Sequence, residues 1–178
     1  MYNKKALTLL EIVISLSIIA IVFVGIATAF GVVMNGLKKS NLELIATNLA
    51  RGLMAEIMAK RFDENFVQPW STTLGPDGGE MRFGTPAYDD VDDYKALDPE
   101  LPPRSPDMQI INLGITNVDI RRYVRCGYAY EASGEWDTQT DPSNYKLITV
   151  TVHITVGDPA VQIMPDLILE EIKAANAE

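Results

Sequence analysis

The sequence predicts an α+β fold, in which a long N-terminal helix packs against a small antiparallel β-sheet. Three observations lead to this prediction. An uncharged apolar run near the N-terminus continues into a segment whose apolar residues recur with helical spacing. A proline-rich stretch follows, and two later segments alternate apolar and polar residues with the period of a β-strand. The chain has 178 residues, which suits one domain of ordinary size.

The apolar run covers residues 12–34, which are 23 residues without a charged side chain. A helix of this length can cross the hydrocarbon core of a bilayer. Glu11 directly precedes the run, and a carboxylate there is costly in hydrocarbon and calls for a partner or a function. Lysine pairs flank the run on both sides, at residues 4–5 and 38–39, so they do not fix its orientation.

The same helix is predicted to continue to about residue 60, since no proline precedes Pro69. Beyond the apolar run, apolar residues recur at steps of three and four: Leu42, Ile45, Leu49, Leu53 and Ile57. We expect this face to pack under the sheet. The helix therefore divides into a transmembrane half, residues 7–36, and an amphipathic half, residues 37–61.

Four glycines interrupt this helix: Gly25, Gly31, Gly36 and Gly52. Glycine lowers helix propensity by about 1 kcal/mol relative to alanine. Small residues also let helices approach closely inside a membrane. Helix packing and local melting during assembly both stay open as explanations.

The globular head is predicted over residues 62–178. Its first part, residues 62–114, is expected to be a long irregular region with short regular elements, because it contains many prolines and a glycine pair. These residues are Pro69, Pro76, Pro86, Pro99, Pro102, Pro103, Pro106, Gly78 and Gly79.

The antiparallel sheet is predicted over residues 115–173. One face of a strand at residues 146–157 carries Ile148, Val150, Val152, Ile154 and Val156. The preceding strand has a matching face of Ile120, Val124, Cys126, Tyr128 and Tyr130. Residues 132–144 between them indicate a connection longer than a tight turn. A third strand is predicted over residues 166–172, because two strands would cover the helix poorly.

The N-terminal residues resemble the class III signal of type IV pilins and of the pseudopilins of type II secretion. The shared order is a basic leader, a small residue, a short apolar entry, a lone acid and a long apolar helix. In that family prepilin peptidase cuts before the apolar helix, which the mature protein retains. The resemblance places the cut between Ala6 and Leu7 and makes Leu7 the N-methylated first residue. It assigns the assembly role to Glu11 together with Thr8 and Leu10.

This resemblance also implies a location and a set of partners. Residues 1–6 become a removable leader, and the chain crosses the bacterial inner membrane once with its head in the periplasm. It then enters an extracellular pilus or a periplasmic pseudopilus. The implied partners are other pilin subunits, prepilin peptidase and the inner-membrane assembly platform. In the fibre, Glu11 would pair with the amino terminus of a neighbouring subunit and fix the register between them.

Two residues depart from the family pattern. Ala6 stands where glycine is commoner, and Thr28 stands where many major pilins carry a helix-bending proline. A plain signal-anchor protein, with Glu11 in the lipid headgroup region, is the alternative interpretation.

Inner segments of the chain resemble the D-type minor pilins of mannose-sensitive haemagglutinin pili. They are residues 55–64 at the end of the predicted helix, residues 74–76, and residues 89–94. For the head, this resemblance implies an antiparallel sheet packed on the helix. It supplies no ligand.

Composition excludes several classes of function. The formal net charge of −9 argues against nucleic acid as a partner of the head. Cys126 is the single cysteine, so it forms no disulfide within the subunit, and we expect a small buried side chain.

The single histidine, His153, lies on the polar face of its strand and is expected to be solvated. No nucleophile has a local histidine base, and we do not expect an enzyme.

The remaining candidate site is an acidic loop with Asp89, Asp90, Asp92 and Asp93. Oxygen ligands in such a loop suit Ca²⁺, although the glycine and distant glutamate of an EF-hand loop are missing. The alternative is a solvated acidic loop with Asx turns.

Three functions therefore stay open. The favoured one is a low-copy minor pilin that initiates, caps or decorates a pilus. The others are a minor pseudopilin of a type II secretion system, and an adhesive or calcium-binding module at a fibre tip with residues 62–114 as its binding surface.

Overall fold

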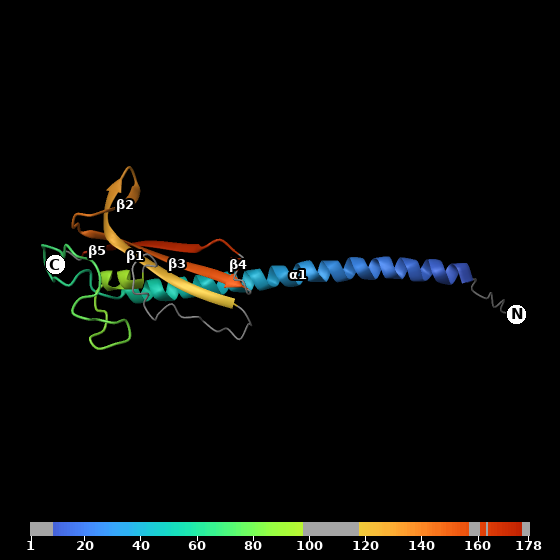
Figure 1. The fold of residues 1–178 in the computed structure, drawn as a ribbon. Helices are drawn as coiled ribbons and strands as arrows, with labels where there is room; N and C mark the ends of the chain where they lie inside the picture. Colours follow the sequence, from blue (N-terminus) through green and yellow to red (C-terminus); the bar gives the residue numbers. More distant parts are fainter. Residues whose placement is uncertain (1–8, 98–117, 157–160, 163, 176–178) are drawn as a thin grey trace. The chain divides into compact units, whose positions relative to one another are not determined.

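The computed structural model describes residues 9–97, 118–156, 161–162 and 164–175. In chain order the elements are helix α1 (Leu9–Met58), 3₁₀ helix η1 (Asp92–Leu97) and strands β1 (Val118–Ala132), β2 (Glu135–Gln139), β3 (Tyr145–Val156), β4 (Val161–Gln162) and β5 (Leu167–Ala174) (Figure 1). One long N-terminal helix and a small antiparallel sheet confirm the predicted α+β class. The chain divides into two compact units after Leu42, and each is described by itself.

Helix α1 runs without interruption for 50 residues. Its predicted start at Leu7 lies outside the described residues. It ends at Met58, slightly before the predicted end near Lys60, where the Lys60 amide donates to the Ile57 carbonyl at 3.0 Å. This three-residue hydrogen bond tightens the last turn and closes the helix.

The last part of α1 buries one face within the head unit. Its buried residues are Ala46, Ala50, Leu53, Met54 and Ile57. Leu42, Leu53 and Ile57 of the predicted apolar face are buried, whereas Ile45 and Leu49 are only half-buried. The buried face is centred on the two alanines, because their small side chains let the rest of the head approach the helix closely.

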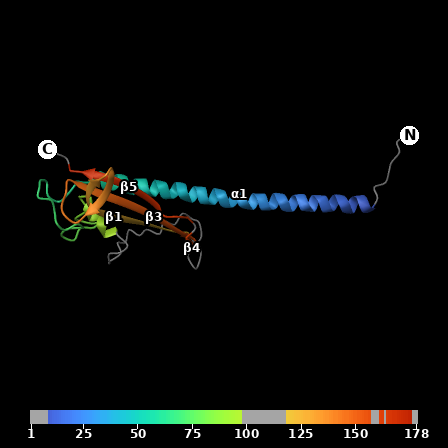
Figure 2. The same ribbon diagram turned by 90° about the horizontal axis from the view of Figure 1, so that it is seen from above.

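The sheet has five antiparallel strands in the described part of the chain. Strands β2, β1, β3 and β4 follow one another, and β5 also pairs with β3. Both views place β1, β3 and β5 alongside the C-terminal part of α1 (Figures 1 and 2). The third strand predicted over residues 166–172 is β5, which pairs with β3 from Tyr145 to Val152.

The register of β1 and β3 brings the two predicted apolar faces together. Ile120 lies opposite Ile154, Val124 opposite Val150, and Cys126 opposite Ile148. All six side chains are buried. Period-two alternation therefore predicted this core face correctly.

Tyr130 was predicted in the core but is 41% exposed. Here β1 continues into a hairpin with β2, and Tyr130 lies opposite Asp137. The predicted long connection contains this strand, joined by a turn with positive φ at Ser133 (57°) and Gly134 (87°). Positive φ at both central residues is the geometry that favours a two-residue hairpin.

Two side chains of β3 have environments that strand periodicity does not predict, and for His153 the structure differs from the expected solvated side chain. Lys146 has the same parity as the core residues of β3 and is completely buried. His153 is not simply solvated, because its Nδ1 lies 2.6 Å from Asp166 Oδ1 and its side chain is 27% exposed. Long-range contacts determine both environments, and strand periodicity does not report them.

The irregular region from residue 62 has only short regular elements in its described part, as predicted. They are η1 and the isolated bridges Arg61 to Asp90 and Met81 to Ala87. The remainder, from residue 98 to residue 114, lies outside the described residues.

Candidate functional site

The N-terminal half of α1 exposes apolar side chains on all sides. Ile21, Phe23 and Val32 are each more than 70% exposed. No residue of the most apolar stretch is buried, and the helix is long and apolar enough to cross a membrane. A helix that is apolar all round requires apolar surroundings, so this surface needs lipid or other helices to cover it.

Hydroxyl groups in this half bond to the helix itself. Ser17 Oγ donates to the Val13 carbonyl at 2.8 Å, and Thr28 Oγ1 donates to the Gly25 carbonyl at 2.9 Å. Such bonds satisfy polar groups without water. A Cβ added at Gly25, Gly31 or Gly36 would meet no atom of the described residues within 4 Å, so packing within this part of the chain does not require glycine there.

Glu11 lies in the first turn of α1 and is exposed, and Leu10 before it is 68% exposed. A negative charge at a helix N-terminus is favourable toward the helix dipole. Ala6, Leu7 and Thr8 lie outside the described residues. The structure thus places Glu11 and Leu10 on an accessible helix end.

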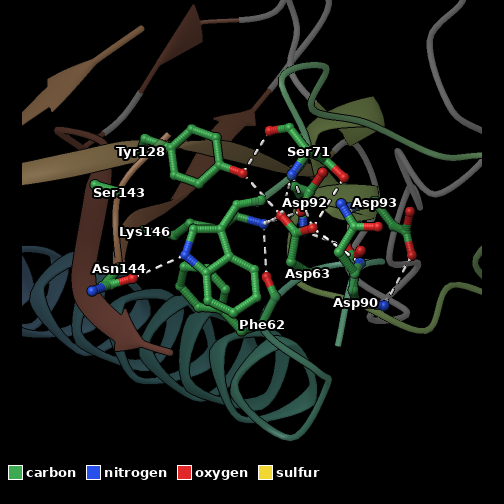
Figure 3. A network of polar contacts seen from close by, with 12 residues as sticks. Phe62, Asp63, Ser71, Asp90, Asp92, Asp93, Tyr128, Ser143, Asn144 and Lys146 are labelled. Carbon is green, nitrogen blue, oxygen red and sulfur yellow. Dashed lines mark hydrogen bonds and ion pairs between the residues drawn. The ribbon is translucent and has the colours of Figure 1, made fainter. Parts of the chain in front are cut away.

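In the head, a buried lysine holds the irregular region against the sheet (Figure 3). Lys146 Nζ donates to the Phe62 carbonyl at 2.7 Å, to Asp63 Oδ2 at 2.9 Å and to Asp92 Oδ1. The rings of Phe62 and Tyr128 lie 4.7 and 5.1 Å from the ammonium. All three donors are used, and the two carboxylates raise the pKa of Lys146 against the effect of burial.

Asp63 is the other centre of this network. Its Oδ1 accepts from the Ser71 amide at 3.1 Å and the Ser71 hydroxyl at 3.0 Å, and its Oδ2 accepts from Tyr128 at 2.9 Å. Burial alone would raise the pKa of Asp63, but hydrogen bonds from Lys146, the Asn65 amide and Tyr128 hold it below its usual range. Asp63 is therefore a buried carboxylate whose oxygens accept hydrogen bonds from protein groups, and it joins the loop to β1 and β3.

A second acidic cluster lies beside this network. Carboxylate oxygens of Glu64, Asp89 and Asp90 lie within 4.8 Å of one another, and so do those of Glu80, Asp89 and Asp93. We call these five residues the carboxylate cluster. Asp90 and Asp93 are only 2% and 1% exposed.

Asp90 and Asp93 also shape the loop that carries them. The Asp93 carboxylate accepts from the amides of Asp89 and Asp90 at 2.8 and 3.0 Å, and Asp90 Oδ1 accepts from the Asp92 amide at 2.9 Å. The bond between Asp90 and the Asp92 amide is an Asx turn of the kind expected for this loop. These hydrogen bonds draw several carboxylates toward one point.

Burial and charge repulsion raise the pKa values of four residues in this cluster. Burial, together with the charges of Asp92 and Asp93, raises the pKa of Asp90 to about 8. Burial and the charge of Asp93 raise the pKa of Glu80 to about 7. Burial likewise raises the pKa of Glu64 and of Asp93. By contrast, the cation of the neighbouring network holds Asp63 ionised.

The four predicted calcium ligands separate into two groups. Asp89, Asp90 and Asp93 belong to the carboxylate cluster, whereas Asp92 pairs with Lys146. Glu64 and Glu80 join the cluster but were not predicted, because they lie far from residues 89–93 in the sequence. Lys146 was also missed, although a lysine in phase with an apolar strand face indicates a buried partner.

Comparison with known proteins identifies the N-terminal segment. The prokaryotic N-terminal methylation motif matches residues 1–27. This motif indicates a type IV pilin-like prepilin. No curated protein and no solved structure matches the chain.

The motif implies that prepilin peptidase processes this prepilin and that it assembles with other pilins through its N-terminal helix. The exposed apolar half of α1 in the structure agrees with that role. Type IV pilins are structural proteins, and the apolar N-terminal helix of this chain is consistent with membrane anchoring.

Proposed function

We propose that this chain is a minor type IV pilin, a low-abundance subunit that initiates, caps or decorates a pilus. Before assembly it is held in the inner membrane by α1 with its head in the periplasm. The observation that carries the proposal is that the apolar half of α1, none of which is buried, follows an N-terminal methylation motif. The resemblance of residues 55–64 and 89–94 to D-type minor pilins favours a minor over a major subunit.

The proposed processing step is a cut between Ala6 and Leu7, followed by methylation of the Leu7 amine. When the assembly platform lifts the subunit out of the bilayer, α1 packs against other pilin helices. The Leu7 amine and the Glu11 carboxylate of neighbouring subunits then enter an apolar core, where each is costly alone and much less so as a pair. We assign Leu10 and Thr8 to the same assembly step.

Replacing Glu11 tests this mechanism. Glu11→Ala is expected to insert and be cleaved normally but to enter sheared surface fibres at least about tenfold less, since tenfold corresponds to only about 1.4 kcal/mol. Glu43→Ala, at an exposed acid further along α1, is the matched control and is expected to enter normally. Incorporation of Glu11→Ala at the wild-type level would contradict the proposed pairing.

A minor pseudopilin uses the same helix and the same assembly physics, so the location of the assembled protein separates the two candidates. A minor pilin co-fractionates with sheared extracellular fibres. Recovery with the cell envelope alone, together with a loss of protein export when the gene is deleted, would favour the pseudopilin.

A further inference from the structure

We propose that the carboxylate cluster, formed by Glu64, Glu80, Asp89, Asp90 and Asp93, is a Ca²⁺ site in the head. Its residues come from three separate parts of the irregular region. Nothing in this inference depends on which filament the subunit enters.

The spacing of the oxygens fits a bound cation. Ca²⁺ binds oxygen ligands at about 2.3–2.6 Å, so ligands on opposite sides of the ion lie about 5 Å apart or less. In each of the two groups, three carboxylate oxygens lie within 4.8 Å of one another. Asp89 belongs to both groups, so the two groups adjoin through one shared side chain.

Three oxygens in the cluster independently point to a missing ligand. Glu64 Oε2, Glu80 Oε2 and Asp89 Oδ1 are fully hidden from solvent and have no hydrogen-bond partner in the described part of the chain. Buried acceptors are nearly always satisfied in folded proteins. Glu64 contributes one orphaned oxygen to the first group and Glu80 contributes one to the second, while Asp89 belongs to both groups. A cation bound in either group would give these oxygens a partner.

Three neighbouring cations already have partners. Lys146 binds Asp63 and Asp92, and Lys60 Nζ donates to the Tyr88 carbonyl at 2.7 Å. Arg61 pairs with Asp89 through Oδ2, which leaves Oδ1 of the same carboxylate as the orphaned atom. Of these three described cations, only Arg61 contacts the cluster, and one positive charge does not balance five carboxylates.

The ligand chemistry favours Ca²⁺ over other metals. All five side chains offer carboxylate oxygen, whereas zinc sites use histidine or cysteine. Several carboxylates on an irregular loop match the flexible coordination of Ca²⁺, and Mg²⁺ instead requires near-ideal octahedral geometry and retains several waters. Binding would tie the segment that follows α1, through Glu64, to the loop segments at Glu80 and at residues 89–93.

The test uses the purified full chain in detergent, stripped with a chelator. CaCl₂ is expected to raise the melting temperature of the head by about 5 °C or more at saturation, and equilibrium dialysis with ⁴⁵Ca is expected to show bound calcium. MgCl₂ at the same concentration is expected to give a smaller shift.

The variant Glu80→Gln/Asp89→Asn keeps the shape of the site but removes two charges. It is expected to weaken calcium binding at least about tenfold. It is expected to melt in chelator no lower than the wild type, because the removal of like-charge repulsion offsets the loss of the exposed Arg61–Asp89 ion pair. A purely structural role would instead lower the melting temperature in chelator. Glu135→Gln, at an exposed acid on β2, is the control and is expected to bind calcium normally.

The proposal is overturned if millimolar calcium neither binds nor shifts the melting temperature. Equal binding by the wild type and by Glu80→Gln/Asp89→Asn would overturn it as well. A cluster that is simply protonated at neutral pH would show the first of these results.

Discussion

The two halves of α1 have the same backbone but opposite surroundings. In the first half Phe23 is 72% exposed and Val32 is 73% exposed, whereas in the second half Ala46 and Ile57 are 0% exposed. The second half contributes one apolar face to the head of its own subunit. The first half exposes apolar side chains on every face among the described residues, and such a surface needs lipid or other helices to cover it.

This difference separates folding from assembly along one helix. Substitutions in the second half change the stability of the head, and substitutions in the first half change membrane insertion or filament entry. Both tryptophans, Trp70 and Trp136, lie in the head, so their fluorescence reports head unfolding in the detergent-solubilised full chain.

The largest effect on head stability is expected for Lys146→Ala. It leaves Asp63 and Asp92 buried without their cation, and removing one partner of a buried ion pair costs about 3–5 kcal/mol. Denaturant unfolding followed by tryptophan fluorescence measures this loss. Lys173→Ala, which removes a bond to the Met58 carbonyl, is expected to cost about 1 kcal/mol. Similar losses for the two variants would show that the buried network does not hold the head together.

Two leucines, one in each half of α1, test the comparison directly. Leu53, which is 1% exposed, contributes to the head core, and Leu53→Ala is expected to destabilise the head by about 2–5 kcal/mol. Leu16, which is 61% exposed, lies in the first half, and Leu16→Ala is expected to change head stability by about 0.5 kcal/mol or less. A comparable loss from Leu16→Ala would break the division between the halves.

A smaller effect is expected from acid. Because the pKa of Asp63 is lower in the folded head than its ordinary value of about 4, the unfolded chain binds the proton first as pH falls. The stability from this ionised carboxylate is present above about pH 4 and is lost below it. The denaturation midpoint, measured from pH 7 to pH 2.5, is expected to fall less steeply in Asp63→Asn. Parallel curves for the wild type and Asp63→Asn would show that Asp63 does not cause the loss of stability in acid.

The sequence predicted the elements whose signals are local. An uncharged run and the helical spacing of Leu53 and Ile57 were enough for α1, and alternation was enough for the facing sides of β1 and β3. The β2 strand was missed because all but one of its residues are exposed, so it has no apolar alternation, although the pair Ser133 and Gly134 marks a two-residue turn.

The polar interior depends on contacts across long sequence distances. Lys146 and Asp63 are 83 positions apart, and no spacing rule links them. Glu64 meets Asp89 and Asp90 only because the irregular region folds back on the end of α1. The aspartates of the loop were recognisable from the sequence. That Asp92 pairs with Lys146, while its neighbours form the carboxylate cluster, depends on a long-range contact that the sequence does not show.

The central claim is that α1 is the retained assembly helix of a processed prepilin. The most direct test is the intact mass of the N-terminal fragment, purified from the native cells with and without active prepilin peptidase. We expect a chain that begins at a methylated Leu7, seen only when the peptidase is active. An N-terminus at Met1 in both samples would contradict the account and leave a membrane-anchored periplasmic domain.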